Sequence, residues 1–335
     1  MLPLSGFGED TMRVIDMHCD TISRLLEKRE ELLQNTGHLD LKRMKESGYL
    51  LQNFALFVEL SKDRDPWEKL CALYELYERE MEKNQALIGK VLQYSDIERN
   101  EREGKLSALL TVEEGAVCKG EIEKLEELYA KGVRMLTLTW NFPNELGYPN
   151  FRGELFEQGF EVMFHSPQTE LGLTGRGREF VIRMEELGMI PDVSHLSDAG
   201  FYDVAAVTKK PFVASHSNAR AVSPCVRNLT DEMIRLLAER GGCMGLNFCP
   251  DFLEEGSKGT VEAVVRHAKH IVKVGGIEVL GLGSDFDGIP GHEELPGAQS
   301  MDRLYDALKK QGFTESQLEK LFYRNVLRVY QDCLR

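Results

Sequence analysis

The sequence predicts a single (β/α)8 barrel of the TIM type, and three features of the chain indicate this α/β fold. Eight short apolar runs of strand length, rich in β-branched residues, occur along the 335 residues. Segments with the spacing of amphipathic helices separate the runs. No linker rich in Pro, Gly or Ser divides the chain, and parallel barrels reach this length as one unit. We therefore expect residues 12–335 to form one barrel domain, with residues 1–11 as a short N-terminal extension.

The predicted strands are distributed over the whole chain. In order, they are residues 13–16, 53–58, 107–112, 133–139, 189–193, 211–215, 243–248 and 279–283. Eight parallel strands are the number that closes a barrel of this type.

The predicted helices lie between these strands. The clearest are residues 67–102, 122–131, 177–187, 231–240 and 261–274, each with apolar side chains at helical spacing. Thr230 is suited to cap the start of helix 231–240, and Gly241 and Gly242 are suited to end it. Strand and helix thus alternate, as a parallel barrel requires.

The composition narrows the range of partners. A net charge of −14 disfavours binding to nucleic acid or to an anionic membrane, because both depend on clustered Lys and Arg. No apolar run approaches the length of a membrane span, and the N-terminus lacks the features of a signal peptide. The seven cysteines are scattered and form no CxxC pair, which is typical of reduced thiols. We expect a cytoplasmic protein with a small-molecule partner and no nucleic-acid or membrane partner.

Ionisable residues follow five of the eight predicted strands. Active sites of such barrels lie at the C-terminal ends of the strands, so these residues are expected to meet. They are His18 and Asp20 after the first strand, Glu113 after the third, His195 after the fifth, His216 after the sixth and Asp285 after the eighth. His18 and Asp20 are two residues apart and therefore point the same way from an extended chain. Three histidines and three carboxylates are a ligand set that suits zinc or a similar divalent metal.

Simpler interpretations compete at single positions. One histidine at a strand end is more often a hydrogen-bonded core residue than a ligand, and only the coincidence at five strand ends favours a metal site. Spacing does not distinguish Glu113 from Glu114, or Asp285 from Asp287, as the functional carboxylate. No role is assigned to the other histidines, which are His38, His165, His267, His270 and His292.

The motifs around these residues resemble those of the membrane (renal) dipeptidases, a zinc dipeptidase group of the amidohydrolase superfamily. The motifs occur in the family's order and are His18-x-Asp20, Thr-Val-Glu113-Glu-Gly, Asp-Val-Ser-His195, Ser-His216-Ser-Asn-Ala and Gly-Ser-Asp285-Phe-Asp-Gly. The resemblance runs from about Met12 to near the C-terminus and includes the Arg227-Asn228 pair.

The resemblance implies a metallo-dipeptidase with two zinc ions. It places His18 and Asp20 on one ion, His195 and His216 on the other, and Glu113, rather than Glu114, on both. We expect a mechanism in which a water molecule that bridges the two metals is deprotonated near neutral pH and attacks the peptide carbonyl.

Further roles follow from the same resemblance. Asp285, rather than Asp287, would transfer the proton to the leaving amine, and Arg227 would hold the terminal carboxylate of the substrate. The expected substrates are dipeptides, including those with a C-terminal D-residue. A homodimer is expected.

The sequence departs from the animal enzymes at Trp140, where they have a histidine that polarises the substrate carbonyl. Asn141 or a metal ion is a possible replacement, and the Trp140 ring is either a substrate-pocket wall or ordinary packing. Phe252 lies near a position where those enzymes use a tyrosine. These differences suggest an altered substrate range.

Two other functions remain as alternatives. One is a barrel hydrolase that acts on another amide, a lactone or an ester, because one fold and metal site serve many reactions. The other is a catalytically silent protein that binds metal or peptide. Dependence of activity on Arg227 would distinguish the dipeptidase from the other hydrolases.

Overall fold

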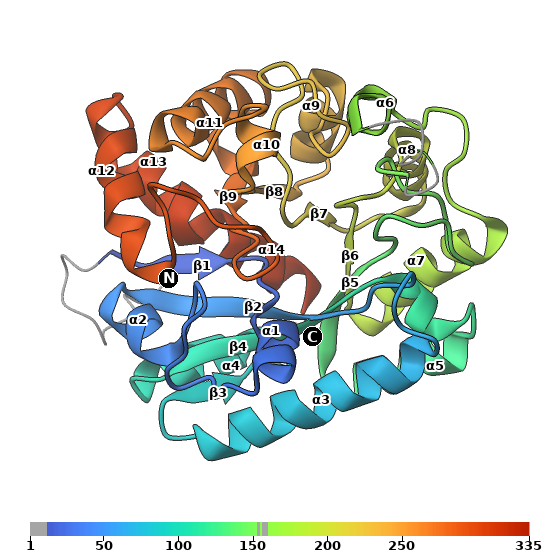
Figure 1. The fold of residues 1–335 in the computed structure, drawn as a ribbon, viewed down its shortest axis with the longest axis horizontal. Helices are drawn as coiled ribbons and strands as arrows, with labels where there is room; N and C mark the ends of the chain where they lie inside the picture. The colour runs from blue at the N-terminus through green and yellow to red at the C-terminus, as the bar shows by residue number, and fades with distance from the viewer. Residues whose placement is uncertain (1–11, 153–154, 156–159, 335) are drawn as a thin grey trace.

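The computed structural model describes residues 12–152, 155 and 160–334, and its centre is a closed parallel barrel (Figure 1). The barrel strands are β1 (Val14–Asp16), β2 (Tyr49–Phe57), β4 (Leu106–Glu113), β5 (Val133–Thr137), β6 (Ile190–Asp192), β7 (Val213–Ala214), β8 (Cys243–Leu246) and β9 (Leu280–Leu282). β1 pairs with β2 on one side and with β9 on the other, which closes the ring. The predicted (β/α)8 fold is confirmed, whereas the predicted extension 1–11 lies outside the described residues.

A ninth strand, β3 (Ile88–Lys90), lies outside the barrel and pairs with the first residues of β4. The prediction of one helix over residues 67–102 is therefore wrong. The segment contains α3 (Pro66–Lys83), β3 and α4 (Tyr94–Arg102). No Gly or Pro marks the end of α3, which stops at Asn84. Gly89 fits β3 because a Cβ atom there would lie 2.2 Å from Asn100 Oδ1.

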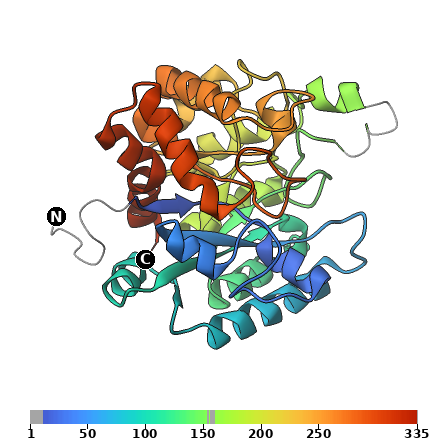
Figure 2. The same cartoon turned by 60° about the vertical axis from the view of Figure 1, so that its left-hand side comes forward.

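Helices surround the barrel, with α3 along one side and α11 and α12 on the opposite side (Figure 1 and Figure 2). The other helices are α1 (Thr21–Lys28), α2 (Leu41–Glu46), α5 (Ile122–Ala130), α6 (Phe160–His165), α7 (Gly175–Leu187), α8 (Asp198–Val207), α9 (Asp231–Glu239), α10 (Pro250–Leu253), α13 (Glu315–Glu319) and α14 (Asn325–Cys333), while α11 is Val261–Gly275 and α12 is Met301–Lys310. The predicted cap of α9 is confirmed, because the Thr230 side chain accepts a hydrogen bond from Met233 N.

The inside of the barrel is apolar at the end where the strands begin. Ile15 and Val213 pack there in one cluster with Val326 and Tyr330 of α14. Tyr330 Oη also donates to Asn53 Oδ1 over 2.8 Å. This packing covers the N-terminal end of the barrel and leaves the opposite end for polar side chains.

Two further predictions concern the cysteines and membrane-spanning segments. All seven cysteines are free, in agreement with the predicted thiols. Within the described part of the chain, no helix combines the length and the apolar character needed to cross a membrane.

Candidate metal centre

The first part of the site is built on the end of β1. Asp16, the last residue of β1, is buried and accepts hydrogen bonds from Ser284 N at 2.9 Å, Ser284 Oγ at 2.6 Å and His18 N at 3.2 Å. These bonds tie the segment after β9 to the segment after β1. His18 Nε2 then lies 3.8 Å from Asp20 Oδ2 and 3.9 Å from Asp285 Oδ1.

Glu113, the last residue of β4, lies between two groups of candidate ligands. Its Oε2 is 3.4 Å from His18 Nε2, while its Oε1 is 3.0 Å from His195 Nε2 and 3.5 Å from His216 Nε2. The neighbouring Glu114 points elsewhere and accepts from Ala116 N at 2.8 Å. Only Glu113 of this pair therefore joins the histidines.

Hydrogen bonds fix the orientation of the other two histidines. His216 Nδ1 donates to Ser215 Oγ over 2.7 Å, and Ser215 Oγ donates to Asp192 Oδ2 over 2.5 Å. His195 Nδ1 lies 2.9 Å from Asn141 Oδ1, an acceptor. With the protons on Nδ1, the Nε2 lone pairs of both rings are free for a metal ion, as is typical of ligating histidines.

Asp285 lies at the end of β9 in a strained backbone conformation, with φ of +62°. Its Oδ2 accepts from Asn247 Nδ2 over 3.0 Å. Asp287 turns away from the site and accepts from Thr21 Oγ1 at 2.6 Å and from His38 N at 2.7 Å. The geometry thus separates the two aspartates that spacing left equivalent.

Burial controls the charges in the site. It raises the pKa of Asp285 to about 7, and the negative charges of Asp20 and Glu113 act in the same direction. Burial lowers the pKa of His195 to about 4, and the positive charge of Arg227 contributes. Burial also lowers the pKa of His216 well below its usual value, and the positive charge of His18 contributes. His195 and His216 are therefore neutral at pH 7, which is the form that binds a metal.

The donor set fits divalent metal ions. Two overlapping groups, His18 with Glu113 and His216, and His18 with Asp20 and Asp285, each bring their ligand atoms within 4.8 Å of one another. His18 Nε2 and Asp20 Oδ1 are buried and have no hydrogen-bond partner within the described part of the chain. The Nε2 atoms of His195 and His216 lie only 3.0 Å apart. Unpaired buried acceptors are costly, and a cation between them would remove this cost.

Three predicted substrate residues surround this cluster. Arg227 is 3% exposed, and its guanidinium carbon lies 5.5 Å from the ring centroid of Phe252. The ring of Trp140 lies 5.0 Å from that of Phe57 and 6.2 Å from that of His195. Asn141 contacts His195, as described above.

Several residues that support the site were not predicted from the sequence. Asp16 and Asp192 orient the ligands from the ends of β1 and β6, and Asn247 contacts Asp285 from the end of β8. Their position gave a usable signal, because each is polar and lies at a strand end. The five histidines without an assigned role stay outside the cluster. His267, for example, is buried between Ala219 N and Leu253 O.

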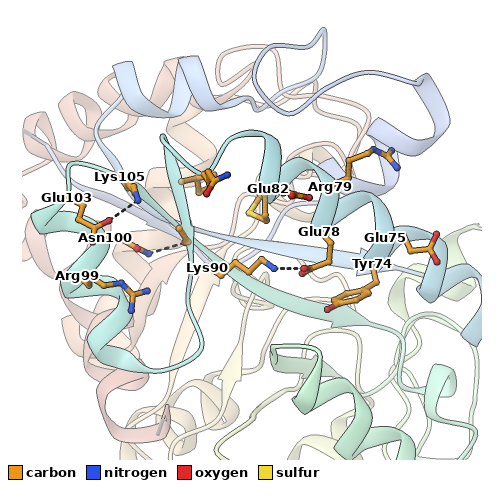
Figure 3. A pocket seen from close by; sticks show the side chains of 14 residues that line it. Tyr74, Glu75, Glu78, Arg79, Glu82, Lys90, Arg99, Asn100, Glu103 and Lys105 are labelled. Atoms are coloured by element: carbon orange, nitrogen blue, oxygen red, sulfur yellow. Dashed lines mark hydrogen bonds and ion pairs between the residues drawn. The ribbon is translucent and has the colours of Figure 1, made fainter.

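A groove on the outside of the barrel is separate from this centre. It lies between α3 and the segment of β3 and α4, and side chains of both charges line it (Figure 3). Two ion pairs join Lys90 to Glu78 at 2.5 Å and Lys105 to Glu103 at 2.8 Å. None of the predicted site residues lines this groove.

Comparison with known proteins identifies the family. The family model described as membrane dipeptidase (peptidase family M19) matches residues 9–333. The chain belongs to this family. Its membership confirms the resemblance found in the motifs.

Two curated relatives match most of the chain. The chain is 35% identical over 272 residues to an uncharacterised protein in the pqqA 5′ region of Klebsiella pneumoniae, covering 79% of this chain and 95% of that protein. It is 29% identical to an uncharacterised dipeptidase of Schizosaccharomyces pombe, covering 88% and 72% of the two chains.

Solved structures of two metallopeptidases have the same fold. A metallopeptidase described as dipeptidase AC superposes with a TM-score of 0.87 at 28% identity, covering 97% of this chain and 99% of its own. A metallopeptidase from Rhodobacter sphaeroides, bound to a phosphinate mimic of the dipeptide L-Ala-D-Ala, gives the same TM-score and identity, covering 97% and 100%.

Proposed function

We propose that this chain is a zinc-dependent dipeptidase that hydrolyses dipeptides, including those with a C-terminal D-residue. One observation carries the proposal: Glu113 contacts His18 through one carboxylate oxygen and His195 and His216 through the other, in a chain of the M19 family. The metallopeptidase from Rhodobacter sphaeroides that binds a phosphinate mimic of L-Ala-D-Ala supports the substrate class.

Two zinc ions would occupy the centre, one held by His18 and Asp20, the other by His195 and His216, with Glu113 shared. When bound, such ions polarise a carbonyl oxygen and lower the pKa of a water molecule. The neutral form of His195 and His216 supports this assignment. The shared carboxylate also supports it, because the pKa of Glu113 is held well below its usual value. Burial opposes that shift, and the positive charge of His18 is the largest contribution in the lowering direction.

Asp285 would move the proton. It would accept the proton from the attacking water and deliver it to the nitrogen of the leaving amine, in the manner of a general base and then a general acid. The hydrogen bond from Asn247 holds one carboxylate oxygen, which leaves Oδ1 directed toward His18.

Arg227 would bind the terminal carboxylate of the substrate. Its guanidinium is buried beside the centre, where a carboxylate would receive two parallel hydrogen bonds. This contact would restrict the enzyme to short peptides with a free C-terminus and argues against lactones and esters without a carboxylate. Trp140 and Asn141 would line the same site, Trp140 as an aromatic wall beside His195.

The test combines metal analysis with an activity assay. The purified protein is analysed for elemental metal content, and amine release from L-L and L-D dipeptides is followed with ninhydrin, with and without a chelator. About two zinc ions per chain and chelator-sensitive cleavage are expected. Bound metal without cleavage of any dipeptide would favour another hydrolase on the same barrel. Absence of metal would contradict both functions. Size-exclusion chromatography tests the expected homodimer.

A further inference from the structure

We propose that Arg220 and Asp198 form a clamp that positions Arg227 for the substrate carboxylate. This inference rests on the proposed function of Arg227 and extends it to two residues outside the metal centre. Arg220 lies four residues after His216, and Asp198 is the first residue of α8. Their side chains form a bidentate pair, with Nη1 of Arg220 2.7 Å from Oδ2 of Asp198 and Nη2 2.8 Å from Oδ1.

The same guanidinium holds the backbone on both sides of Arg227. Arg220 Nε donates to the carbonyl oxygen of Asn228 over 2.9 Å, and Nη2 donates to that of Val226 over 3.2 Å. Asp198 thus fixes the guanidinium, and the guanidinium fixes the peptide groups that flank Arg227. A planar fork of donors is required for this arrangement, and a lysine ammonium does not provide it.

Asn150 connects the clamp to the metal centre. Its side-chain nitrogen donates to Asp198 Oδ1 over 2.6 Å and to Val226 O over 3.0 Å. Its backbone nitrogen donates to the carbonyl oxygen of His195 over 2.8 Å. One buried residue therefore joins the segment of a candidate metal ligand to the segment of Arg227.

The side chain of Arg227 depends on this support. Its Nη2 donates to His216 O over a long 3.4 Å, and its Nε has no hydrogen-bond partner within the described residues. The guanidinium therefore keeps donors for a ligand, and its place is set largely by its own backbone. Displacement of a substrate-binding group by about 1 Å can reduce the rate by roughly a hundredfold.

The test measures recognition of the carboxylate rather than activity alone. Wild-type protein, Arg220→Met and Arg220→Lys are compared on one dipeptide and on the same dipeptide with a C-terminal amide. For Arg220→Met we expect kcat/KM on the dipeptide to fall by roughly ten- to a hundredfold, mainly through KM, while the slower cleavage of the amide is unchanged. Arg220→Lys is expected to restore little, because it lacks the fork.

A matched control is available on the surface. Arg178 of α7 pairs with Asp203 of α8 in a similar Arg–Asp ion pair that makes no contact with the segment of Arg227. Arg178→Met is expected to leave both substrates unaffected. Equal losses on the dipeptide and the amide in Arg220→Met, or no loss on either, would overturn the clamp. If Arg220→Met does not fold, Asp198→Asn provides the same comparison with nearly the same side-chain shape.

Arg227→Met separates this inference from the function on which it rests. If Arg227→Met cleaves the dipeptide and the amide in the wild-type ratio, carboxylate binding by Arg227 fails, and the clamp fails with it. If Arg227→Met loses the preference for the dipeptide and Arg220→Met keeps it, only the clamp is wrong. Metal content is measured for each variant, so that loss of the metal is not mistaken for loss of carboxylate recognition.

Discussion

The imidazole rings of His18 and His216 stack, with centroids 3.9 Å apart and an angle of 28° between the ring planes. His18 comes from the end of β1 and His216 from the end of β7, and we propose that they bind different ions. The ligands of the two proposed ion positions therefore pack against each other, and loss of a ligand at one position is expected to weaken metal binding at the other.

Replacing His216 is expected to disturb both ions. In His216→Ala, one ligand is lost and the packing of His18 is removed, so we expect metal content below one ion per chain and no measurable dipeptide cleavage. Elemental analysis of the purified variant measures the first effect and the ninhydrin assay the second. Full retention of one tightly bound ion would show that the two positions are independent.

Asn141 is expected to control metal affinity rather than folding. Its Oδ1 receives the Nδ1 proton of His195, and loss of such an orienting partner typically reduces metal affinity roughly ten- to a hundredfold. Competition with a chelator measures the change in Asn141→Ala, and Asn144→Ala serves as a nearby comparison that leaves the His195 contact intact. Unchanged affinity in Asn141→Ala would indicate that the bond does not orient the ligand.

Asp285→Asn is expected to keep metal and lose rate. The amide nearly preserves the shape of the side chain but accepts no proton, and loss of a general base costs typically 10²- to 10⁴-fold, about 3 to 5 kcal/mol in activation free energy. The decrease should be in kcat, with elemental analysis showing normal metal content. Full activity in this variant would exclude the proton-transfer role.

His267 is expected to make the protein less stable in acid. Burial lowers the pKa of His267 from 6.5 to about 4, and the positive charge of Arg266 contributes. Its Nδ1 accepts a hydrogen bond from Ala219 N. The unfolded chain binds this proton at higher pH than the folded chain, so stability is complete above pH 6.5 and is lost as the pH falls toward 4. The contribution lost between pH 7.5 and pH 5 is roughly 2 kcal/mol.

Urea unfolding at the two pH values measures this contribution. In His267→Gln, an amide can accept from Ala219 and donate to Leu253 without titrating, so the loss of stability on acidification should be smaller than in the wild type. An identical loss in both proteins would assign the acid sensitivity to other groups. Activity at neutral pH should be retained, because His267 lies outside the metal centre.

Much of the architecture followed from local patterns. Each of the eight barrel strands overlaps one of the eight predicted runs, because strands of a parallel barrel are apolar on both faces and form continuous runs. The break between α3 and α4 was not predicted, because apolar residues continue at helical spacing and no helix-breaking residue marks Asn84. The pairing of β3 with β4 is a long-range contact, and its sequence has no distinct signal.

The residue pattern alone specified the ligand types, their order and their places at strand ends, because the alternation of strand and helix brings those ends to one side of the barrel. It did not distinguish Glu113 from Glu114 without the resemblance to a family, since adjacent residues on a strand point to opposite sides. The tertiary structure decided that Glu113 meets three histidines whereas Glu114 accepts from Ala116 and Trp140. It also brought Arg220, Asp198 and Asn150 together around Arg227, because side-chain hydrogen bonds between distant loops depend on how the strands and helices pack.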